Sequence, residues 1–252
     1  MQQKIVLITG GSRGLGRSTA LMLAKQGVDV VLTYQSRQAD AMAVVAEIAA
    51  LGRKAIALPL DVGQIDSFGA FVLQLQAGLD QTWQCAEFDF LVNNAGVGVH
   101  TSFTDTNEAQ FDLLMNVHFK GVFFLTQALL QLIANQGRII NVSSGLTRFS
   151  LPGFSAYAAM KGAIEVLSKY LAKELGSRGI TVNVIAPGAI ETDFGGGAVR
   201  DNEQMNQFIA GQTALGRVGL PDDIGGVIAS LLSDQSGWIN AQRIEVSGGI
   251  FI

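Results

Sequence analysis

Cysteine and histidine, which supply cross-links and most soft metal ligands, are almost missing from this chain. Its 252 residues include one cysteine, Cys85, and two histidines, His100 and His118. A single thiol excludes an internal disulfide, and so few thiol and imidazole groups argue against a metal cluster. We therefore expect no metal site and a reducing, cytoplasmic environment.

Charge and long apolar runs are also scarce. Only 15% of the residues are charged, the net charge is −4, and like charges do not cluster, so neither nucleic acid nor an anionic membrane surface is an expected partner. No apolar run reaches the roughly 18 residues of a membrane span, and the start MQQKIVLITGG lacks a long apolar leader region. We expect a soluble, unprocessed protein.

What the chain does contain is an alternation of short apolar runs and helical patterns. Hydrophobic residues make up 48%, enough for one large core at this length. The apolar runs predict buried strands at residues 5–8, 28–32, 55–60, 88–92, 138–142, 181–185 and 243–246. Helical periodicity predicts helices at residues 17–25, 39–50, 67–79, 108–134, 156–175 and 221–232.

This alternation is typical of α/β proteins with a doubly wound, mostly parallel seven-stranded sheet and helices on both faces. Glycine ends several helices just before a strand, as a left-handed cap does, at Gly27, Gly52, Gly137 and Gly179. No linker or repeat divides the chain, so we predict one domain over residues 1–252. Residues 189–211 lack clear periodicity and are predicted to form a substrate lid, with a short helix at 206–210.

The segment ITGGSRGLG, residues 8–16, places three glycines between a predicted strand and a predicted helix. One interpretation is a tight turn and nothing more. The other is a dinucleotide site, in which Gly10 makes the turn, Gly14 lets the backbone approach a pyrophosphate and Gly16 lets the helix pack on the strand. The helix N-terminus then faces the anion. The spacing differs, however, from the G-x-G-x-x-G form.

Tyr157 and Lys161 are four residues apart in a helical pattern, so their side chains project from one helix face. An unperturbed tyrosine titrates near ~10, and a neighbouring ammonium favours the phenolate and lowers that pKa. Such a pair suits acid/base chemistry at neutral pH. Taken alone, the same spacing also occurs by chance on a helix surface.

The segment TGGSRGLG, followed in order by Asn93-Asn94-Ala95-Gly96, Ser144, Tyr157-Ala-Ala-Met-Lys161 and Pro187-Gly188, strongly resembles the short-chain dehydrogenase/reductase family over residues 6–249. Through GRVGLPDDIGGVIASLLSD and the C-terminal VSGG, the chain looks most like the 3-oxoacyl-acyl-carrier-protein reductases. The resemblance implies a one-domain Rossmann-type enzyme that moves hydride between a nicotinamide and an alcohol or carbonyl.

The family implies roles for four residues. Tyr157 would be the general acid that protonates the carbonyl oxygen, and Lys161 would lower its pKa and bind the nicotinamide ribose. Ser144 would hold the substrate oxygen; Ser143 is a rival, but the family spacing of thirteen residues to the tyrosine selects Ser144. Asn116 would help hold a water in a proton relay through Lys161, although it could also be a tolerated or kinked helix position.

The resemblance also implies cofactor contacts. Asp61 would bind the adenine amino group, Asn93 would brace the sheet, and Thr192 would bind the carboxamide. Ala95 and Gly96 would leave room for the adenosine ribose. The full set is Gly10, Ser12, Arg13, Gly14, Leu15, Gly16, Thr33, Ser36, Arg37, Asp61, Val62, Asn93, Ala95, Gly96, Tyr157, Lys161, Pro187, Gly188, Ile190 and Thr192.

The end of the second predicted strand indicates which nicotinamide is used. Selectivity for NAD commonly needs an acidic residue there, and Thr33 stands in its place. Arg37 follows and Arg13 lies in the glycine segment, so two guanidiniums can bind a 2′-phosphate with no opposing carboxylate. We predict a preference for NADP(H), with NAD(H) also possible.

The predicted activity is NADPH-dependent reduction of a ketone or 3-oxoacyl carbonyl to a secondary alcohol. One alternative is an NAD(P)-dependent alcohol, sugar or polyol dehydrogenase acting oxidatively. The other is a catalytically silent dinucleotide-binding regulator. Substrate-deciding segments at 97–103, 145–154 and 189–211 are largely apolar, which favours an uncharged, partly hydrophobic carbonyl, while Arg148 could face an acidic group or solvent.

Helices 108–134 and 156–175 are apolar on more than one side. Similar family members pair these helices across a twofold axis, so we expect a homotetramer. Two further features have no functional interpretation: the extension around Trp83 and Cys85, and His118, which we assign to helix packing.

Overall fold

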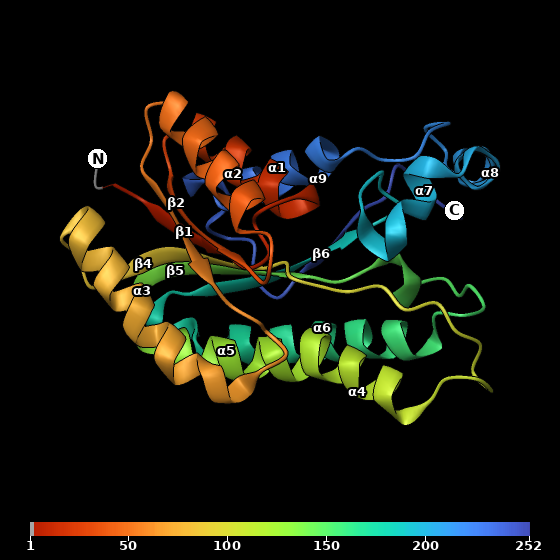
Figure 1. Ribbon diagram of the computed structural model, residues 1–252, viewed down its shortest axis with the longest axis horizontal. Coiled ribbons are helices and arrows are strands. Elements are labelled where there is room, and N and C mark those ends of the chain that lie inside the picture. The colour runs from red at the N-terminus through yellow and green to blue at the C-terminus, as the bar shows by residue number, and fades with distance from the viewer. Residues whose placement is uncertain (1–2) are drawn as a thin grey trace.

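The computed structural model describes residues 3–252, which form one sheet of seven strands in the order β3-β2-β1-β4-β5-β6-β7 (Figure 1). Each pair of neighbouring strands is parallel. The strands are β1 (Ile5–Ile8), β2 (Asp29–Tyr34), β3 (Ala55–Pro59), β4 (Phe88–Asn93), β5 (Ile133–Val142), β6 (Thr181–Pro187) and β7 (Arg243–Val246). The predicted doubly wound fold is confirmed.

Helices cover both faces of the sheet (Figure 1). One layer contains α1 (Gly14–Lys25), α2 (Gln38–Ala50) and α9 (Pro221–Leu231). The opposite layer contains α3 (Phe68–Trp83), α4 (Glu108–Met115), α5 (Gly121–Leu129) and α6 (Ser155–Glu174). Two short helices, α7 (Ala198–Asp201) and α8 (Glu203–Gly211), lie within the segment 189–211 predicted as a lid, and the helix expected at 206–210 falls within α8.

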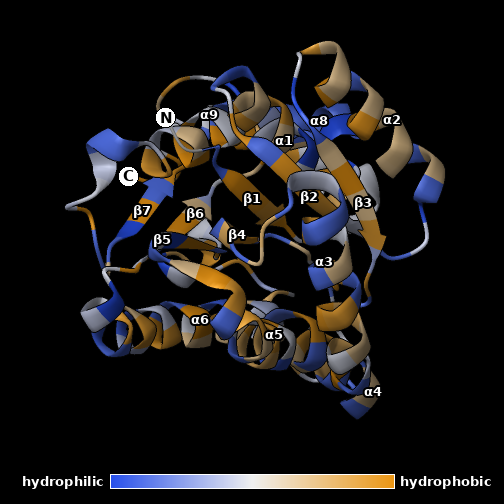
Figure 2. Ribbon diagram, turned by 90° about the vertical axis from the view of Figure 1, so that its left-hand side faces the viewer, coloured by the Kyte–Doolittle hydropathy of each residue, from blue (hydrophilic) through white to orange (hydrophobic). Residues whose placement is uncertain are grey.

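Successive side chains of a strand point to opposite faces of the sheet, so each face has its own hydrophobic core. In β1, Val6 and Ile8 pack with the α1 and α9 side, whereas Ile5 and Leu7 pack with the α3 and α5 side. All four are at most 3% exposed. Burying such a side chain contributes about 1.5 to 3 kcal/mol. Figure 2 shows the hydrophobic colour along the central strands, between the helical layers.

The strand order reverses between β1 and β4, which pair on the same sheet. In open α/β sheets, ligands bind in the crevice outside the carboxyl ends of the strands at such a switch point. The glycine segment after β1 and the asparagines at the end of β4 meet there, so the topology places the predicted motifs together.

The long helix predicted at 108–134 differs from the structure. It is interrupted by a π-helical turn at Asn116–Lys120, where the Gly121 N–H bonds to the Asn116 carbonyl five residues earlier, and it ends at Leu132. Residues 133–134 already belong to β5. The apolar pattern runs through the helix end into the strand, so periodicity alone hid the boundary.

The run Glu108–Leu132 is, by length and composition, long and apolar enough to cross a membrane, contrary to the expectation from the sequence. The core helix of a globular protein satisfies the same criterion. Here Leu125 and Leu129 are at most 1% exposed and belong to the core on the α3 and α5 side, so the helix packs against the sheet.

One predicted glycine cap is also corrected. Gly27, Gly52 and Gly179 have positive φ, as a left-handed cap requires, but before Gly137 it is Gln136 that adopts φ of 65°. Gly137 is needed for space instead, because a Cβ there would lie 2.7 Å from the carbonyl oxygens of Ala134 and Asp89.

The extension around Trp83 has a structural explanation. Asp29 begins β2 and is 1% exposed. Its carboxylate accepts hydrogen bonds from the Trp83 indole at 2.7 Å, the Arg53 guanidinium at 2.8 Å and the Lys54 backbone N–H at 2.9 Å. The last residue of α3 therefore helps to satisfy a buried charge, which is costly to leave unpaired. The Cys85 thiol bonds to the Glu87 carbonyl nearby.

Candidate active site

The glycine segment after β1 forms a close-packed turn. Gly10 and Gly14 have φ of +66° and +53°, in the left-handed region that glycine adopts without strain. A Cβ on Gly16 would lie 2.3 Å from the Gly10 carbonyl oxygen and 2.6 Å from the Asn94 amide nitrogen. Only glycine fits, so helix α1 begins directly against the turn.

The first turn of α1 offers backbone N–H groups to an anion. Its N-cap is Arg13, and within residues 3–252 no side chain caps that first turn. Uncapped N–H groups and the positive end of the helix dipole together bind phosphate. Ser12 and Leu15, two further predicted contacts, flank this point and are half-buried. The residues present therefore fit the pyrophosphate of a dinucleotide.

Two polar side chains hold the turn from neighbouring strands. Thr33, predicted to contact the cofactor, is 1% exposed, and its hydroxyl accepts the Gly10 N–H at 3.2 Å. The Asn94 amide donates to the carbonyls of Thr9 at 2.9 Å and Gly10 at 3.1 Å. Asn94 was not among the predicted site residues, although the motif Asn-Asn-Ala-Gly contains it. Both residues shape the turn.

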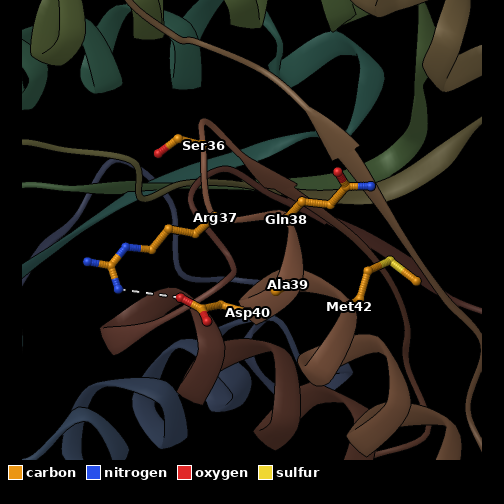
Figure 3. Close-up of a pocket in the computed structure, with 6 residues that line it drawn as sticks. All are labelled: Ser36, Arg37, Gln38, Ala39, Asp40 and Met42. Atoms are coloured by element: carbon orange, nitrogen blue, oxygen red, sulfur yellow. Dashed lines mark hydrogen bonds and ion pairs between the residues drawn. The ribbon is translucent and has the colours of Figure 1, made fainter.

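The two predicted phosphate-binding arginines lie at this edge, about half exposed. Contrary to expectation, each is paired with a carboxylate. Arg13 bonds to Asp193 at 3.0 Å, and Arg37 lies 3.4 Å from Asp40. Ser36, Arg37 and Asp40 line a hollow at the start of α2 (Figure 3). Exposed ion pairs contribute only about 0 to 1 kcal/mol, so a phosphate can replace either carboxylate.

Asp61 and Val62 follow β3 at the same edge. The Asp61 carboxylate accepts hydrogen bonds from the Gln35 amide and the Gly63 backbone N–H, both at 2.8 Å. Val62 is 9% exposed, and a Cβ added to Gly121 would lie only 2.2 Å from the Val62 carbonyl oxygen. The glycine after the π-turn thus lets α5 approach the loop that carries Asp61.

Asn93 lies beneath the site in a buried network. Its amide donates to Asn141 of β5 at 2.8 Å and to Thr126 of α5 at 3.1 Å. Asn141 in turn donates to Ser168 of α6 at 2.9 Å. Satisfied buried networks fix the relative positions of the elements they join. Asn93 therefore ties β4 to β5 and α5, and Ala95 and Gly96 continue the chain after it.

Tyr157 and Lys161 lie one turn apart on α6 and are 8% and 5% exposed. The Lys161 Nζ lies 5.7 Å from the centre of the Tyr157 ring and donates to the Val142 carbonyl at 2.7 Å. Burial lowers the pKa of the Lys161 ammonium to about 7. The two side chains are together, as their spacing predicted.

The direction of the tyrosine shift is opposite to the prediction. Burial raises the pKa of the Tyr157 phenol above its ordinary value, and a hydrogen bond with Ser144 opposes that shift only in part. The charged form of a phenol loses hydration when it is buried. Tyr157 is therefore protonated at neutral pH and can donate a proton.

Ser144 and Ser143 differ in their hydrogen-bond partners, and this difference distinguishes the two candidates. The Ser144 hydroxyl faces Tyr157 and also accepts the Leu146 N–H at 3.2 Å. The Ser143 hydroxyl is directed the other way and donates to Glu165 at 2.7 Å. Of the two candidates, the structure brings Ser144 to the phenol.

Asn116 and His118 lie on the π-turn. The Asn116 main-chain carbonyl bonds to Gly121, which makes the turn. His118 is 1% exposed, and its ring meets that of Tyr157 edge-on, with centres 5.0 Å apart. We assigned His118 to helix packing from the sequence, so this contact was missed. A lone histidine in a long apolar helix was the available signal.

The end of β6 continues the site toward the predicted lid. Pro187 is buried, and Gly188 packs against Ser247, where a Cβ would be 2.9 Å away. Ile190 forms a bridge with Gly219. A Cβ added to Gly14 would lie 3.6 Å from the Thr192 methyl, and Asp193 bonds to Arg13, so residues 189–211 lie beside the glycine turn.

The same segment reaches the catalytic tyrosine candidate. The Phe194 ring lies 5.8 Å from the Tyr157 ring and is 44% exposed.

Arg148, for which the sequence left open whether it faces an acidic group or solvent, bonds to Glu245 at 2.6 Å and to the carbonyls of Ile250 and Phe251. It therefore anchors the C-terminal segment beside the loop after Ser144.

Comparisons with known proteins agree with this arrangement. A family model described as enoyl-(acyl carrier protein) reductase matches residues 10–250. Versicolorin reductase 1 of Dothistroma septosporum is 35% identical, over 98% of this chain and 96% of its own. The 3-oxoacyl-[acyl-carrier-protein] reductase of Staphylococcus aureus is 36% identical, over 99% and 98%.

A solved structure gives the same result. The angucycline C-6 ketoreductase LanV, with bound NADP, has a TM-score of 0.94 and 34% identity, over 98% of this chain and 95% of its own. The order of the motifs, the parallel sheet and these matches along almost the whole length lead to one conclusion. The chain is an oxidoreductase of the short-chain dehydrogenase/reductase family and resembles its 3-oxoacyl-acyl-carrier-protein reductases.

Proposed function

We propose that this protein reduces the carbonyl of a ketone or a 3-oxoacyl thioester to a secondary alcohol, with NADPH as the hydride donor and Tyr157 as the general acid. The observation that carries this proposal is the group formed by the buried Tyr157 and Lys161 and the half-buried Ser144 at the carboxyl edge of the sheet, beside the glycine turn. Relatives named as a versicolorin reductase, a 3-oxoacyl reductase and a ketoreductase support it.

Each side chain has a defined task. The protonated phenol of Tyr157 donates to the substrate oxygen as negative charge develops there, and Ser144 donates a second hydrogen bond to the same oxygen. Bound NADPH would supply the hydride. In its protonated form Lys161 places a positive charge beside the tyrosine, which stabilises the phenolate left after proton transfer. Because these groups are fixed by packing, little reorganisation accompanies the reaction.

The residues around the acid favour an uncharged, partly aromatic or aliphatic substrate. Phe194 faces Tyr157 from the segment 189–211. Arg148, the basic residue closest in sequence to Ser144, is already bound to Glu245 and the C-terminal backbone. We propose that residues 189–211 form a lid, because Asp193 bonds to Arg13 of the glycine segment while the Phe194 ring lies 5.8 Å from the Tyr157 ring.

The test of this function is a parallel titration with NADPH and NADH, followed by NADPH oxidation against a panel of ketones, bicyclic aromatic ketones and 3-oxoacyl thioesters. We expect tight NADPH binding and turnover of at least one uncharged carbonyl. Tight binding without turnover on the panel would favour the silent regulator, and turnover only of alcohols with NADP⁺ would favour an oxidative dehydrogenase.

Cofactor preference gives a separate prediction. Replacing both Arg13 and Arg37 by alanine should raise the KM for NADPH roughly ten- to hundredfold, because charge-assisted hydrogen bonds to the 2′-phosphate are lost, and should leave the KM for NADH unchanged. The matched control is Arg17→Ala, an exposed arginine of α1 that pairs with Glu47. Equal losses for both cofactors, or a wild-type enzyme as efficient with NADH, would contradict the assignment.

We also propose a homotetramer, because large hydrophobic side chains are exposed on α4, α5 and α6. They are Phe111, Leu113, Phe123, Phe124, Val166 and Tyr170. Clustered exposed apolar groups of this size usually mark an interface. Sedimentation at micromolar concentration should give a tetramer, and Val166→Asp together with Tyr170→Asp should give smaller species. A wild-type monomer at that concentration would refute the proposal.

A further inference from the structure

Four charged side chains of alternating sign form a row along residues 143–148, which we call the Ser144 loop. In order of contact they are Glu165, Arg243, Glu245 and Arg148, joined by ion pairs of 2.8, 3.0 and 2.6 Å. The first three side chains are only 18 to 23% exposed. Charges withdrawn from water need close partners, and salt screens their attraction less than that of exposed pairs. The proposed catalytic group uses none of the four.

Glu165 joins the Ser144 loop to the helix that carries the acid. It lies on α6, two turns after Tyr157. Its Oε1 accepts hydrogen bonds from the hydroxyls of Ser143 and Thr147, both at 2.7 Å. Hydrogen bonds to an ionised carboxylate are about twice as strong as those between neutral groups. The carboxylate therefore holds the loop on both sides of Ser144.

Arg243, the first residue of β7, reaches the main chain of Ser144. Its Nε donates to Glu165 at 2.8 Å and its Nη1 donates to Glu245 at 3.0 Å. Its Nη2 donates to the Ser144 carbonyl at 3.3 Å and to the Thr147 hydroxyl at 3.1 Å. One planar guanidinium thereby joins α6, β7 and the Ser144 loop, which the point charge of a lysine could not do.

The other end of the row holds the loop from β7. Arg148, the last residue of the Ser144 loop, donates to the two carboxylate oxygens of Glu245 at 2.8 and 2.6 Å. The hydrogen bonds from Arg148 lower the pKa of Glu245 to about 2, so this carboxylate is charged at neutral pH. The loop is therefore bound by an acidic residue of α6 on one side and by an acidic residue of β7 on the other.

The position of the Ser144 hydroxyl depends on this loop. The hydroxyl faces Tyr157 and accepts the Leu146 N–H at 3.2 Å, so its direction follows the main chain of the loop. A hydrogen-bond donor stabilises developing charge only when it is aimed at the atom that gains the charge. A displacement of about 1 Å can lower a rate about a hundredfold.

We propose that Arg243 and Glu165 are positioning residues for Ser144. They clamp the Ser144 loop to α6, so that the Ser144 hydroxyl and the Tyr157 phenol converge on one substrate oxygen. This inference rests on the proposed reductase function. Neither side chain transfers a proton or contacts the substrate. The alternative role is stabilisation of the fold alone, and the two roles predict different results for combined substitutions.

The first experiment is a double-mutant cycle of Arg243→Gln with Ser144→Ala. We expect Arg243→Gln to lower kcat about tenfold or more, with the KM for the carbonyl and the dissociation constant for NADPH within about threefold. Added to Ser144→Ala, the same substitution should lower kcat by less than about threefold, because both changes remove one hydrogen bond to the substrate oxygen. An unchanged kcat in Arg243→Gln, or losses that simply multiply, would overturn the proposal.

The matched control is Arg178→Gln. Arg178 also donates to a side chain and to main-chain carbonyls, namely Asn135 at 2.9 Å, Leu130 at 2.8 Å and Ile133, but these lie at or before the start of β5. Both arginine variants should lower the urea midpoint of unfolding, whereas kcat in Arg178→Gln should stay within about threefold. If the control loses kcat as Arg243→Gln does, general stability explains the loss and the proposal fails.

Thr147→Val tests the clamp if Arg243→Gln does not fold. It removes only the hydroxyl that contacts Glu165 and Arg243. We expect kcat to fall about threefold or more, and again by little in the Ser144→Ala background. A wild-type kcat in Thr147→Val would contradict the proposal.

Hydrogen exchange provides a measurement that needs no turnover. The amides of Leu146, Arg148 and Phe149 bond to acceptors within residues 144–145. In the protein without substrate, exchange of these amides should be at least about tenfold faster in Arg243→Gln and unchanged in Arg178→Gln. Unchanged exchange in Arg243→Gln would overturn the clamp. A wild-type protein that reduces no carbonyl would instead refute the reductase function, with these exchange rates unaffected.

Discussion

Tyr157→Phe is expected to lower kcat for carbonyl reduction by about 10²- to 10⁴-fold while leaving the dissociation constant for NADPH within about threefold. In the proposed mechanism the buried phenol, together with Ser144, donates to the substrate oxygen, and a positioned general acid contributes a factor of this size. The ring itself stays in place, because its packing against His118 and Phe194 involves the aromatic carbons.

The measurement is single-turnover oxidation of bound NADPH with the best substrate of the panel, together with a fluorescence titration of NADPH. Phe194→Tyr is the matched control, since it adds a hydroxyl to the ring that faces Tyr157 and leaves the acid intact; its kcat should stay within about tenfold. Normal turnover by Tyr157→Phe would show that another group protonates the product.

The second large effect is expected at the glycine turn. Gly16→Ala should abolish measurable NADPH binding, with a loss of at least about a hundredfold, and should destabilise the fold by about 1 to 3 kcal/mol. An alanine Cβ would meet the Gly10 carbonyl oxygen at 2.3 Å. That atom belongs to the turn itself, so relief of the overlap must distort the surface that receives the pyrophosphate.

The control is Gly226→Ala in α9, where an added Cβ meets nothing within 4 Å. Because alanine favours a helix interior over glycine, this variant should be stabilised by up to about 1 kcal/mol and should bind NADPH normally. Urea unfolding and the same fluorescence titration measure both quantities. If Gly16→Ala binds NADPH like the wild type, the cofactor does not lie on this turn.

The sequence predicted the fold well because its signals were local. Each strand was a short apolar run, and glycines after α1, α2 and α6 have the positive φ expected of caps. Prediction failed at the end of the helix before β5, where no cap interrupts the apolar pattern. It also missed the π-turn, which depends on how closely Gly121 can approach the loop after β3.

The candidate site was predictable where residue types and order were sufficient, as for Tyr157 and Lys161. The site was not predictable where residues far apart in the sequence come into contact only in the folded chain. The partner of Arg13 is Asp193, which lies 180 residues away in the sequence. The pKa of Tyr157 depends on burial, which a spacing of four residues does not reveal, and His118 acquires its place only when Val97 folds back over the helix.

The anchoring of the C-terminal segment by Arg148 has a practical consequence. Backbone hydrogen bonds also join residues 248–251 to residues 212–215, just after α8. In Figure 1 the C-terminus emerges beside α7 and α8, whereas β1 begins toward the other end of the molecule. An affinity tag or fusion partner attached after Ile252 would therefore crowd α7, α8 and the proposed lid, and an attachment ahead of β1 is the better choice for immobilising or labelling this protein.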